Sequence, residues 1–301
     1  MSTIFRKEGQ PNVSAPQMAN IEQLERLKQG ALIWNQWRVK NPEILPDLQG
    51  ACLKGASLCG INLQEANLIG ADLSGANLRQ ANFERAELRD VNMTHADCLG
   101  AYLGEASLIG AHLSNINLQE ANLWLAKMGG ATLVDANLIG VNFRSATLAK
   151  TTMNGANLFG ADLSFALAGE ADLGSTNLAT ANLRGTDLVG ANLDGANCRF
   201  ANFHKANLTR CSVRGADLAL ANLVETKFFQ SNLEGADFSQ ADLQRAILVD
   251  TRLSHAKLTN GKGVSKEQLR GAILDETTQL PEHTTSTADE VYAIPLIESV
   301  P

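Results

Sequence analysis

Five histidines and five cysteines are the side chains of this 301-residue chain best suited to nucleophilic catalysis or metal binding. No two cysteines form a C-x-x-C pair, and the sequence contains no metal-ligand spacing. Catalysis requires several such groups to converge on one pocket, whereas these groups are scattered. We therefore predict a non-enzymatic protein with no catalytic site, no metal and no cofactor. The side chains concerned are His95, His112, His204, His255, His283, Cys52, Cys59, Cys98, Cys198 and Cys211.

A five-residue pattern must position all of these side chains except His283. Between Ala51 and Asn260 it repeats forty-two times without insertion or deletion, as in ANLIG at 66–70 and ADLSG at 71–75. The first position is mostly Ala, the second Asn or Asp, and the third Leu. A period of five matches neither a helix nor a strand. It therefore predicts an all-β solenoid with very short repeating units.

The five positions divide into inward and outward ones. The apolar first and third positions are expected to face the interior, and the varied second, fourth and fifth positions to face solvent. Gly fills the fifth position in 15 of 42 repeats, which predicts a positive φ in many coils. Ala168 stands at a third position where Leu is usual. We expect Ala168 to point inward, with its void partly filled by neighbours, rather than Leu167 to turn inward in its place.

The repeats resemble the pentapeptide-repeat family, whose motif is A-[DN]-L-x-x. The resemblance covers about 70% of the chain. The flanking stretches WNQWR at 34–38, PDL at 46–48 and LRGA at 269–272 look like segments that flank cyanobacterial members. The resemblance implies a right-handed quadrilateral β-helix with four pentapeptides in each coil and about 10.5 coils.

Four pentapeptides per coil would place residues twenty apart directly above one another. His95 and His255 would then share a face but lie eight coils, or roughly 40 Å, apart. Three phenylalanines would share one interior column, and two sets of charged residues would form ladders of alternating sign. The phenylalanines are Phe83, Phe143 and Phe203, and the ladders are Glu65, Arg85, Glu105 and Lys205, Glu225, Arg245.

The segments outside the repeat predict a cap at each end, because a stack of coils exposes unpaired backbone there. Residues 19–45 are expected to form a helical N-terminal cap. Its helix begins after Asn20, with Gln23 in capping-box position, and runs to about Lys40. The β-helix then occupies 46–260, and 261–275 supply a helix over 264–270 and a last repeat-like turn. The cap's apolar stripe is Leu24, Leu27, Ala31 and Trp34, widened by Ile33 and Trp37.

The two terminal stretches carry no periodicity. We expect residues 1–18 to be disordered. Residues 276–301 begin polar and end apolar, and the segment VYAIPLI at 291–297 has three possible fates. It folds back over the rod, stays disordered or engages a partner.

Charge and composition restrict the partners and the compartment. Lys and Arg number 25 against 32 Asp and Glu, for a net charge of −7, so there is no basic footprint for direct nucleic-acid binding. No apolar run approaches the length of a membrane span, and residues 1–18 lack the apolar core of a signal peptide. Scattered cysteines, odd in number, fit a reducing compartment, with Cys98 and Cys198 expected in the core. We therefore predict a cytoplasmic protein without a membrane span.

Information about partners can only lie at outward positions and at the ends. Apolar fourth-position residues gather on two opposite predicted faces, and Trp124 with Leu125 is an exception on a polar face. Either they form an interface, or Ile and Val flank the turns through β-propensity alone. The first apolar face is Ile69, Ile109, Val189, Phe229 and Val249, and the opposite face is Leu99, Ile139 and Phe159.

We therefore predict a scaffold or protein-interaction module with an unknown protein partner, present as a monomer or an end-to-end dimer. The alternative comes from the resemblance: some family members mimic DNA and inhibit or protect a topoisomerase such as gyrase. Two features disfavour it here, since the charge is nearly balanced and no loop interrupts the coils. A mimic of a duplex with one charge per ~1.7 Å should be far more acidic.

Overall fold

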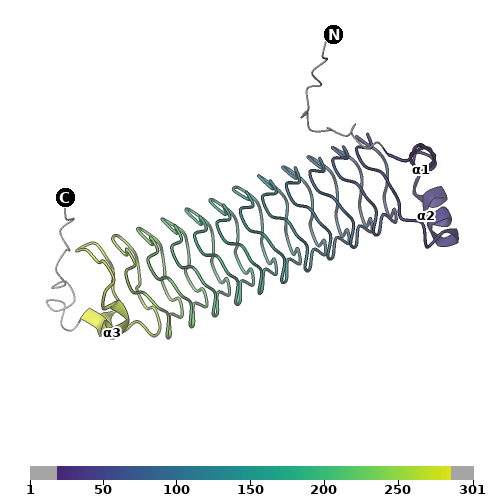
Figure 1. Cartoon of the computed structure of the whole chain (residues 1–301). Helices are drawn as coiled ribbons and strands as arrows, with labels where there is room; N and C mark the ends of the chain where they lie inside the picture. The colour runs from purple at the N-terminus through teal and green to yellow at the C-terminus, as the bar shows by residue number, and fades with distance from the viewer. Residues whose placement is uncertain (1–18, 286–301) are drawn as a thin grey trace, which may run out of the picture.

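Each pentapeptide builds one side of a coil in a long rod. The computed structural model describes residues 19–285. The second residue of each pentapeptide pairs in parallel with the residue twenty positions later, from Asp47 with Asn67 through to Asp242 with Lys262. These pairs are single bridges between extended residues, and the coils stack along one axis (Figure 1). The predicted solenoid is confirmed.

Hydrogen bonding explains why Asn or Asp dominates the second position. In the pentapeptide 71–75 the first, second, third and fifth N–H groups donate to backbone carbonyls. The fourth N–H, on Ser74, instead donates to Oδ1 of Asp72 at 2.9 Å. Asparagine adds a second bond, since Nδ2 of Asn182 donates to Oδ1 of Asp162 in the preceding coil at 3.0 Å. The second position was expected simply to face solvent, and that view is incomplete because most of these side chains are half-buried.

The first and third positions form the interior, as predicted. Phe83, Phe143 and Phe203 are each 0% exposed. Ala168 is buried and Leu167 is 53% exposed, so the expected orientation of this exceptional pentapeptide is confirmed. Where a buried first position is Thr, Ser or Cys, its side chain donates to a backbone carbonyl, as Thr226 Oγ1 does to the carbonyl of Phe203 at 2.8 Å. These polar side chains are thereby accommodated in an apolar core.

The fifth position requires a left-handed backbone throughout the rod. Every fifth residue from 50 to 260 has φ between 54° and 73°, whether or not it is glycine. The predicted positive φ is therefore confirmed in all coils. Bulky residues occupy the same conformation, including Phe165 at 59° and Thr180 at 60°. An L-residue is strained there, so glycine is the least costly choice.

Two helices, rather than the single predicted helix, form the N-terminal cap. Helix α1 spans Ile21–Leu27 and α2 spans Ala31–Lys40. The chain breaks at Gly30, whose φ of 102° is incompatible with a continuous helix. Asn20 caps α1 as predicted, accepting from the N–H of Gln23 at 3.1 Å. The predicted capping box is incomplete, because Gln23 Oε1 accepts from the N–H of Asp47 and so joins the cap to the first coil.

The cap covers the open end of the rod with the predicted tryptophans. Trp34 is fully buried, and its indole N–H donates to the carbonyl of Asn62 at 2.7 Å. The Trp37 ring lies 5.0 Å from it. Leu27 is buried and Leu24 is partly buried, both packing against the core. Ile33 was expected in this stripe but is 40% exposed, because the residues of α2 that are buried are Trp34 and Arg38.

Hydrogen bonds to the first coils hold α2 in place. Asn35 accepts from the N–H of Asn62 at 2.8 Å and donates to the carbonyl of Gly60 at 2.9 Å. The buried Arg38 guanidinium donates to the carbonyls of Ile44 and Gln64. Backbone groups that the end of a solenoid would leave unpaired are thus satisfied by side chains.

A short helix and the segment that follows it cover the C-terminal end of the rod. Helix α3 spans Lys266–Leu269, as the sequence predicted, with Ser265 and Gln268 in a complete capping box. Gln268 Nε2 also donates to the carbonyls of Leu243 and Ala246. The ladder resumes beyond α3, where Arg252 pairs with Ile273 and Lys257 with Gln279. Helix α4 spans Glu282–Thr285. The expectations for residues 1–18 and 291–297 lie outside the described residues.

Candidate interaction surfaces

The cysteines and histidines do not combine into a reactive centre within residues 19–285. Burial raises the pKa of the Cys98 and Cys198 thiols, and it raises that of Cys211 to about 12. These thiols are therefore protonated core side chains rather than nucleophiles. Among the described residues, no group of three or more His, Cys, Asp or Glu could hold a metal ion.

The outer corners carry the predicted ladders of opposite charge. Arg85 lies 3.6 Å from both Glu65 and Glu105. Glu225 lies 3.7 Å from Lys205 and 3.4 Å from Arg245. Both ladders are thereby confirmed. Exposed pairs of this kind contribute only about 0.2–1 kcal/mol each, so their main consequence is a nearly neutral corner.

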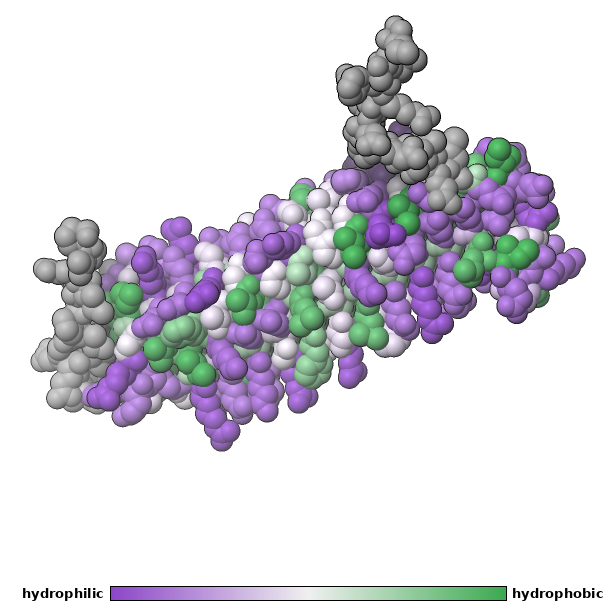
Figure 2. Space-filling model, viewed as in Figure 1, coloured by the Kyte–Doolittle hydropathy of each residue, from purple (hydrophilic) through white to green (hydrophobic). Residues whose placement is uncertain are grey.

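The first apolar face is discontinuous. Ile109, Phe229 and Val249 are 45%, 36% and 42% exposed, whereas Ile69 and Val189 are only partly exposed. Arg89 and Thr209 occupy the same column and interrupt it. Figure 2 likewise shows apolar side chains as separate patches among hydrophilic ones on the face in view.

The middle of this face is hollowed rather than flat. Between Ile109 and Val189 the fourth positions hold only Gly129, Ala149 and Gly169. A depression of about 510 Å³ lies there, lined by Ile109, the two small residues nearest it and the side chains of flanking pentapeptides. Small residues at an outward corner thus create a shallow apolar recess.

The opposite face is smaller. Phe159 is 46% exposed, whereas Leu99 and Ile139 are partly exposed. Gln119 separates Leu99 from the other two. The structure therefore brings Ile139 and Phe159 together in neighbouring coils and leaves Leu99 apart.

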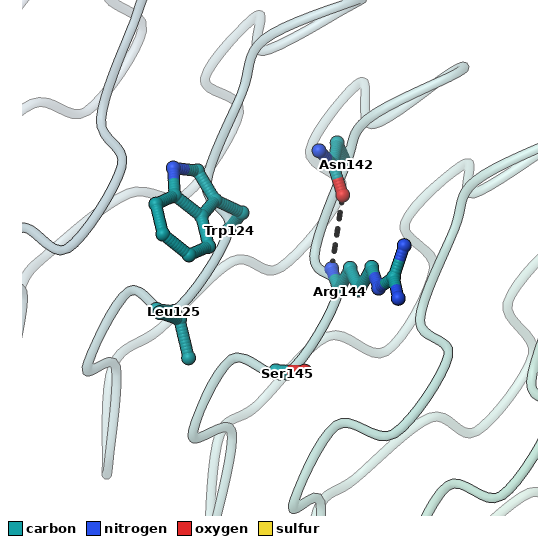
Figure 3. A pocket seen from close by; sticks show the side chains of 5 residues that line it. All are labelled: Trp124, Leu125, Asn142, Arg144 and Ser145. Atoms are coloured by element: carbon teal, nitrogen blue, oxygen red, sulfur yellow. Dashed lines mark hydrogen bonds between the residues drawn. The ribbon is translucent and has the colours of Figure 1, made fainter.

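Trp124 lies in a second depression, on a third side of the rod (Figure 3). This depression measures about 500 Å³ and is lined by Trp124 and Leu125 of one coil and by Asn142, Arg144 and Ser145 of the next. Trp124 is 39% exposed and Leu125 41% exposed.

Several exposed apolar residues escaped the sequence analysis because it considered mainly fourth positions. Second and fifth positions also face outward. An apolar residue at a second or fifth position, where Asn, Asp or Gly is usual, could therefore have been recognised as exposed from the sequence. Tyr102 is 50% exposed and Phe165 48% exposed, both on the side that carries Trp124. The others are Phe200 and Ile247, whereas the exposed Leu167 was predicted to face outward.

No helix within the described part of the chain is long and apolar enough to cross a bilayer. The stacked coils and the capped ends define a solenoid repeat protein. The sequence model for pentapeptide repeats matches in eight copies between residues 47 and 260. The chain belongs to the pentapeptide-repeat family.

Solved structures similar to this chain include cyanobacterial members of the family. HetL from Nostoc sp. strain PCC 7120, involved in heterocyst differentiation regulation, is 33% identical over 73% of this chain and 87% of its own, with a TM-score of 0.47. Rfr23 from Cyanothece 51142 is 25% identical over 50% of this chain and 90% of its own, with a TM-score of 0.30. QnrB1, a plasmid-mediated fluoroquinolone resistance protein, is 17% identical over 67% of this chain and 98% of its own, with a TM-score of 0.41. No curated protein matches the sequence significantly.

Proposed function

We propose that the protein is a non-enzymatic rod that binds a partner protein through apolar side chains at its outward positions. The observation that carries this is the exposure of large apolar residues on a rod whose interior is already filled. Phe159 and Phe229 contribute nothing to that interior and have no ring partner among the described residues. An exposed aromatic side chain is the type most enriched at protein interfaces.

The recess beside Ile109 and the exposed ring of Phe159 would serve different parts of one partner, or two partners. They lie on different sides of a stiff rod, so a scaffold could hold two proteins at a fixed separation. We propose further that the rod is right-handed with about 10.5 coils and works in the cytoplasm.

The oligomeric state would be a monomer or an end-to-end dimer. Contact at the N-terminal end is supported by exposed apolar residues on the outer side of the cap. Ile21, Leu32 and Val39 are 75%, 71% and 80% exposed. Light scattering with Leu32→Glu, Val39→Glu distinguishes the two states, because only a dimer built on this end would dissociate.

Quantitative affinity capture from native lysate tests the function. The bait is the full chain, compared with a Phe159→Glu, Phe229→Glu variant. A matched control, Gln119→Glu with Thr209→Glu, adds the same charge to polar residues of the same two faces. We expect the wild type and the control to capture the same specific proteins and the phenylalanine variant to lose them. Identical sets from all three baits would exclude these two faces.

DNA mimicry is the weaker candidate. The mixed-charge ladders at Arg85 and Glu225 do not reproduce the continuous negative charge of a duplex. Addition of the protein to a gyrase supercoiling assay tests it directly. Inhibition, or protection from a fluoroquinolone, at micromolar concentration would favour mimicry over the scaffold.

A further inference from the structure

We propose that the side of the rod around Trp124 binds an acidic segment of a partner protein that carries a large apolar side chain. The site is called here the aromatic corner and comprises Tyr102, Trp124, Leu125 and Phe165, with Arg144 and Arg184 beside them. This proposal rests on the protein-binding function above and adds the chemistry of the partner. It concerns a different side of the rod from Phe159 and Phe229.

Two glycines leave room for aromatic rings from neighbouring coils. A Cβ added to Gly104 would lie 2.7 Å from the indole Nε1 of Trp124. A Cβ added to Gly185 would lie 2.9 Å from the ring of Phe165. Any larger residue at either place would push the ring away. Trp124 leans over the preceding coil and Phe165 over the following one, so the space between them stays open.

That open space is the depression shown in Figure 3. Trp124 and Leu125 form one wall, and Asn142, Arg144 and Ser145 of the next coil form the other. Continuing along the rod, the corresponding positions hold Ser164, which is small, and then Phe165. The depression is large enough for one apolar side chain and is apolar on the wall that Trp124 supplies.

Two arginines at this corner have no carboxylate partner. The described residues form no ion pair with Arg144 or Arg184, and the Arg184 guanidinium lies 6.0 Å from the centre of the Phe165 ring. Other arginines at fourth or fifth positions, such as Arg79, Arg85 and Arg214, do contact carboxylates. Arg210 and Arg252 of the repeat also form no ion pair among the described residues, so what distinguishes this corner is that two such guanidinium groups lie on the same side of the rod.

The chemistry of the partner follows from these two features. A large apolar side chain would fill the depression against Trp124, and two carboxylates further along the segment, towards the C-terminal end of the rod, would accept from the guanidinium groups of Arg144 and Arg184. Arg144 and Arg184 stand two coils, or roughly 10 Å, apart along the rod. Carboxylates three residues apart in a polyproline II segment share one face and lie about 9.3 Å apart, which matches that separation, so the segment would run parallel to the rod axis. Single-stranded nucleic acid is disfavoured because it requires a continuous basic groove.

Phe200 provides a matched control. It too is a phenylalanine at a fifth position, 56% exposed, with the Arg199 guanidinium 5.7 Å from its ring centre. Arg199, however, pairs with Asp217 at 3.2 Å. The two sites therefore share an aromatic ring and an arginine and differ in whether the arginine is neutralised.

The test is selection of peptides from a phage-displayed random library on the full-length protein, followed by affinity measurements on the enriched peptides. We expect these to carry acidic residues around an aromatic or aliphatic one. Trp124→Ala should weaken their binding about 30-fold, and Arg144→Glu with Arg184→Glu about tenfold. Phe200→Ala should leave it unchanged. Replacing the acidic residues of a peptide by lysine should restore its binding to the charge-reversed variant, which also shows that this variant is folded.

Four results would overturn the proposal: no enriched peptide, enriched peptides without acidic residues, affinities unaffected by Trp124→Ala, or displacement of bound peptide by oligo(dT). Peptides that bind normally to the Trp124→Ala variant would reject the aromatic corner while leaving protein binding intact. Conversely, an unchanged capture with the Phe159 and Phe229 variant would reject those faces and leave the aromatic corner untouched.

Discussion

The inward and outward positions of the same pentapeptides are constrained by different forces. Inward residues such as Phe143 are completely buried, so size and shape restrict them. Fourth-position residues such as Phe159 and Arg144 point away from the coil and touch little of it, so stability restricts them weakly. Variation at an inward position should therefore change stability without changing recognition, and variation at an outward corner should do the reverse. Four substitutions, in decreasing order of their effect on stability, test that separation.

Phe143→Ala should have the largest effect. Removing a fully buried phenylalanine from a stacked column leaves a cavity and should lower the free energy of unfolding by about 3–5 kcal/mol. Urea denaturation followed by circular dichroism measures it. Phe159→Ala, with its ring 46% exposed, is the control and should cost less than about 1 kcal/mol. Equal losses in the two variants would remove the distinction between inward and outward positions.

Trp34→Phe probes the junction between cap and rod. Phenylalanine fills most of the volume that the indole occupied, but the carbonyl of Asn62 loses the indole N–H donor. This loss should lower the free energy of unfolding by about 1–3 kcal/mol. Hydrogen exchange should report faster opening of the first coils and no change near residue 200. Unchanged exchange in the first coils would show that the cap does not secure this end.

Asn182→Asp tests the second position, whose side chain is half-buried and so lies between the buried inward positions and the exposed fourth positions. Aspartate keeps the acceptor for the fourth N–H but loses the Nδ2 bond to Asp162 and places two carboxylates together. We expect a loss of about 1–2 kcal/mol at pH 7. Repulsion would raise the folded-state carboxylate pKa values, so the loss should shrink as the pH falls towards about 4. Asn182→Ala, which has no added charge, should not share that pH dependence.

Thr180→Gly should give the smallest change, with the opposite sign. Thr180 is β-branched, exposed and held at φ 60°. Glycine removes that strain and should add about 0.5–1 kcal/mol to the free energy of unfolding. A higher midpoint in urea measures it. A lower midpoint would mean that the left-handed conformation costs threonine nothing in this setting.

The fold was predictable from the sequence because interior positions repeat. The period placed Leu and Ala inside, and the fifth-position glycines indicated the positive φ found in every coil. The break of the cap at Gly30 was not predicted, because the apolar stripe continues across it and only the docking of Trp34 and Arg38 favours two helices.

The surface was less predictable for a related reason. Outward positions lack a repeating pattern, so Phe165 and Tyr102 were overlooked although both are exposed. The placement of Trp124 depends on Gly104, a fourth-position residue from the preceding coil. Only the stacking of coils reveals that pair, since the residues are twenty apart. The hydrogen bond that the second-position side chain accepts from the fourth N–H could likewise be recognised only from the geometry of the turn.

Parallel affinity capture with an inward and an outward variant tests the central claim most directly. The baits are the wild type, Phe143→Leu inside the rod, and Phe159→Glu with Phe229→Glu on its surface, each confirmed as folded by circular dichroism. We expect the inward variant to retain the partner set at reduced stability and the outward variant to lose it at full stability. Retention of the same partners by the outward variant, or their loss from the inward one, would contradict it.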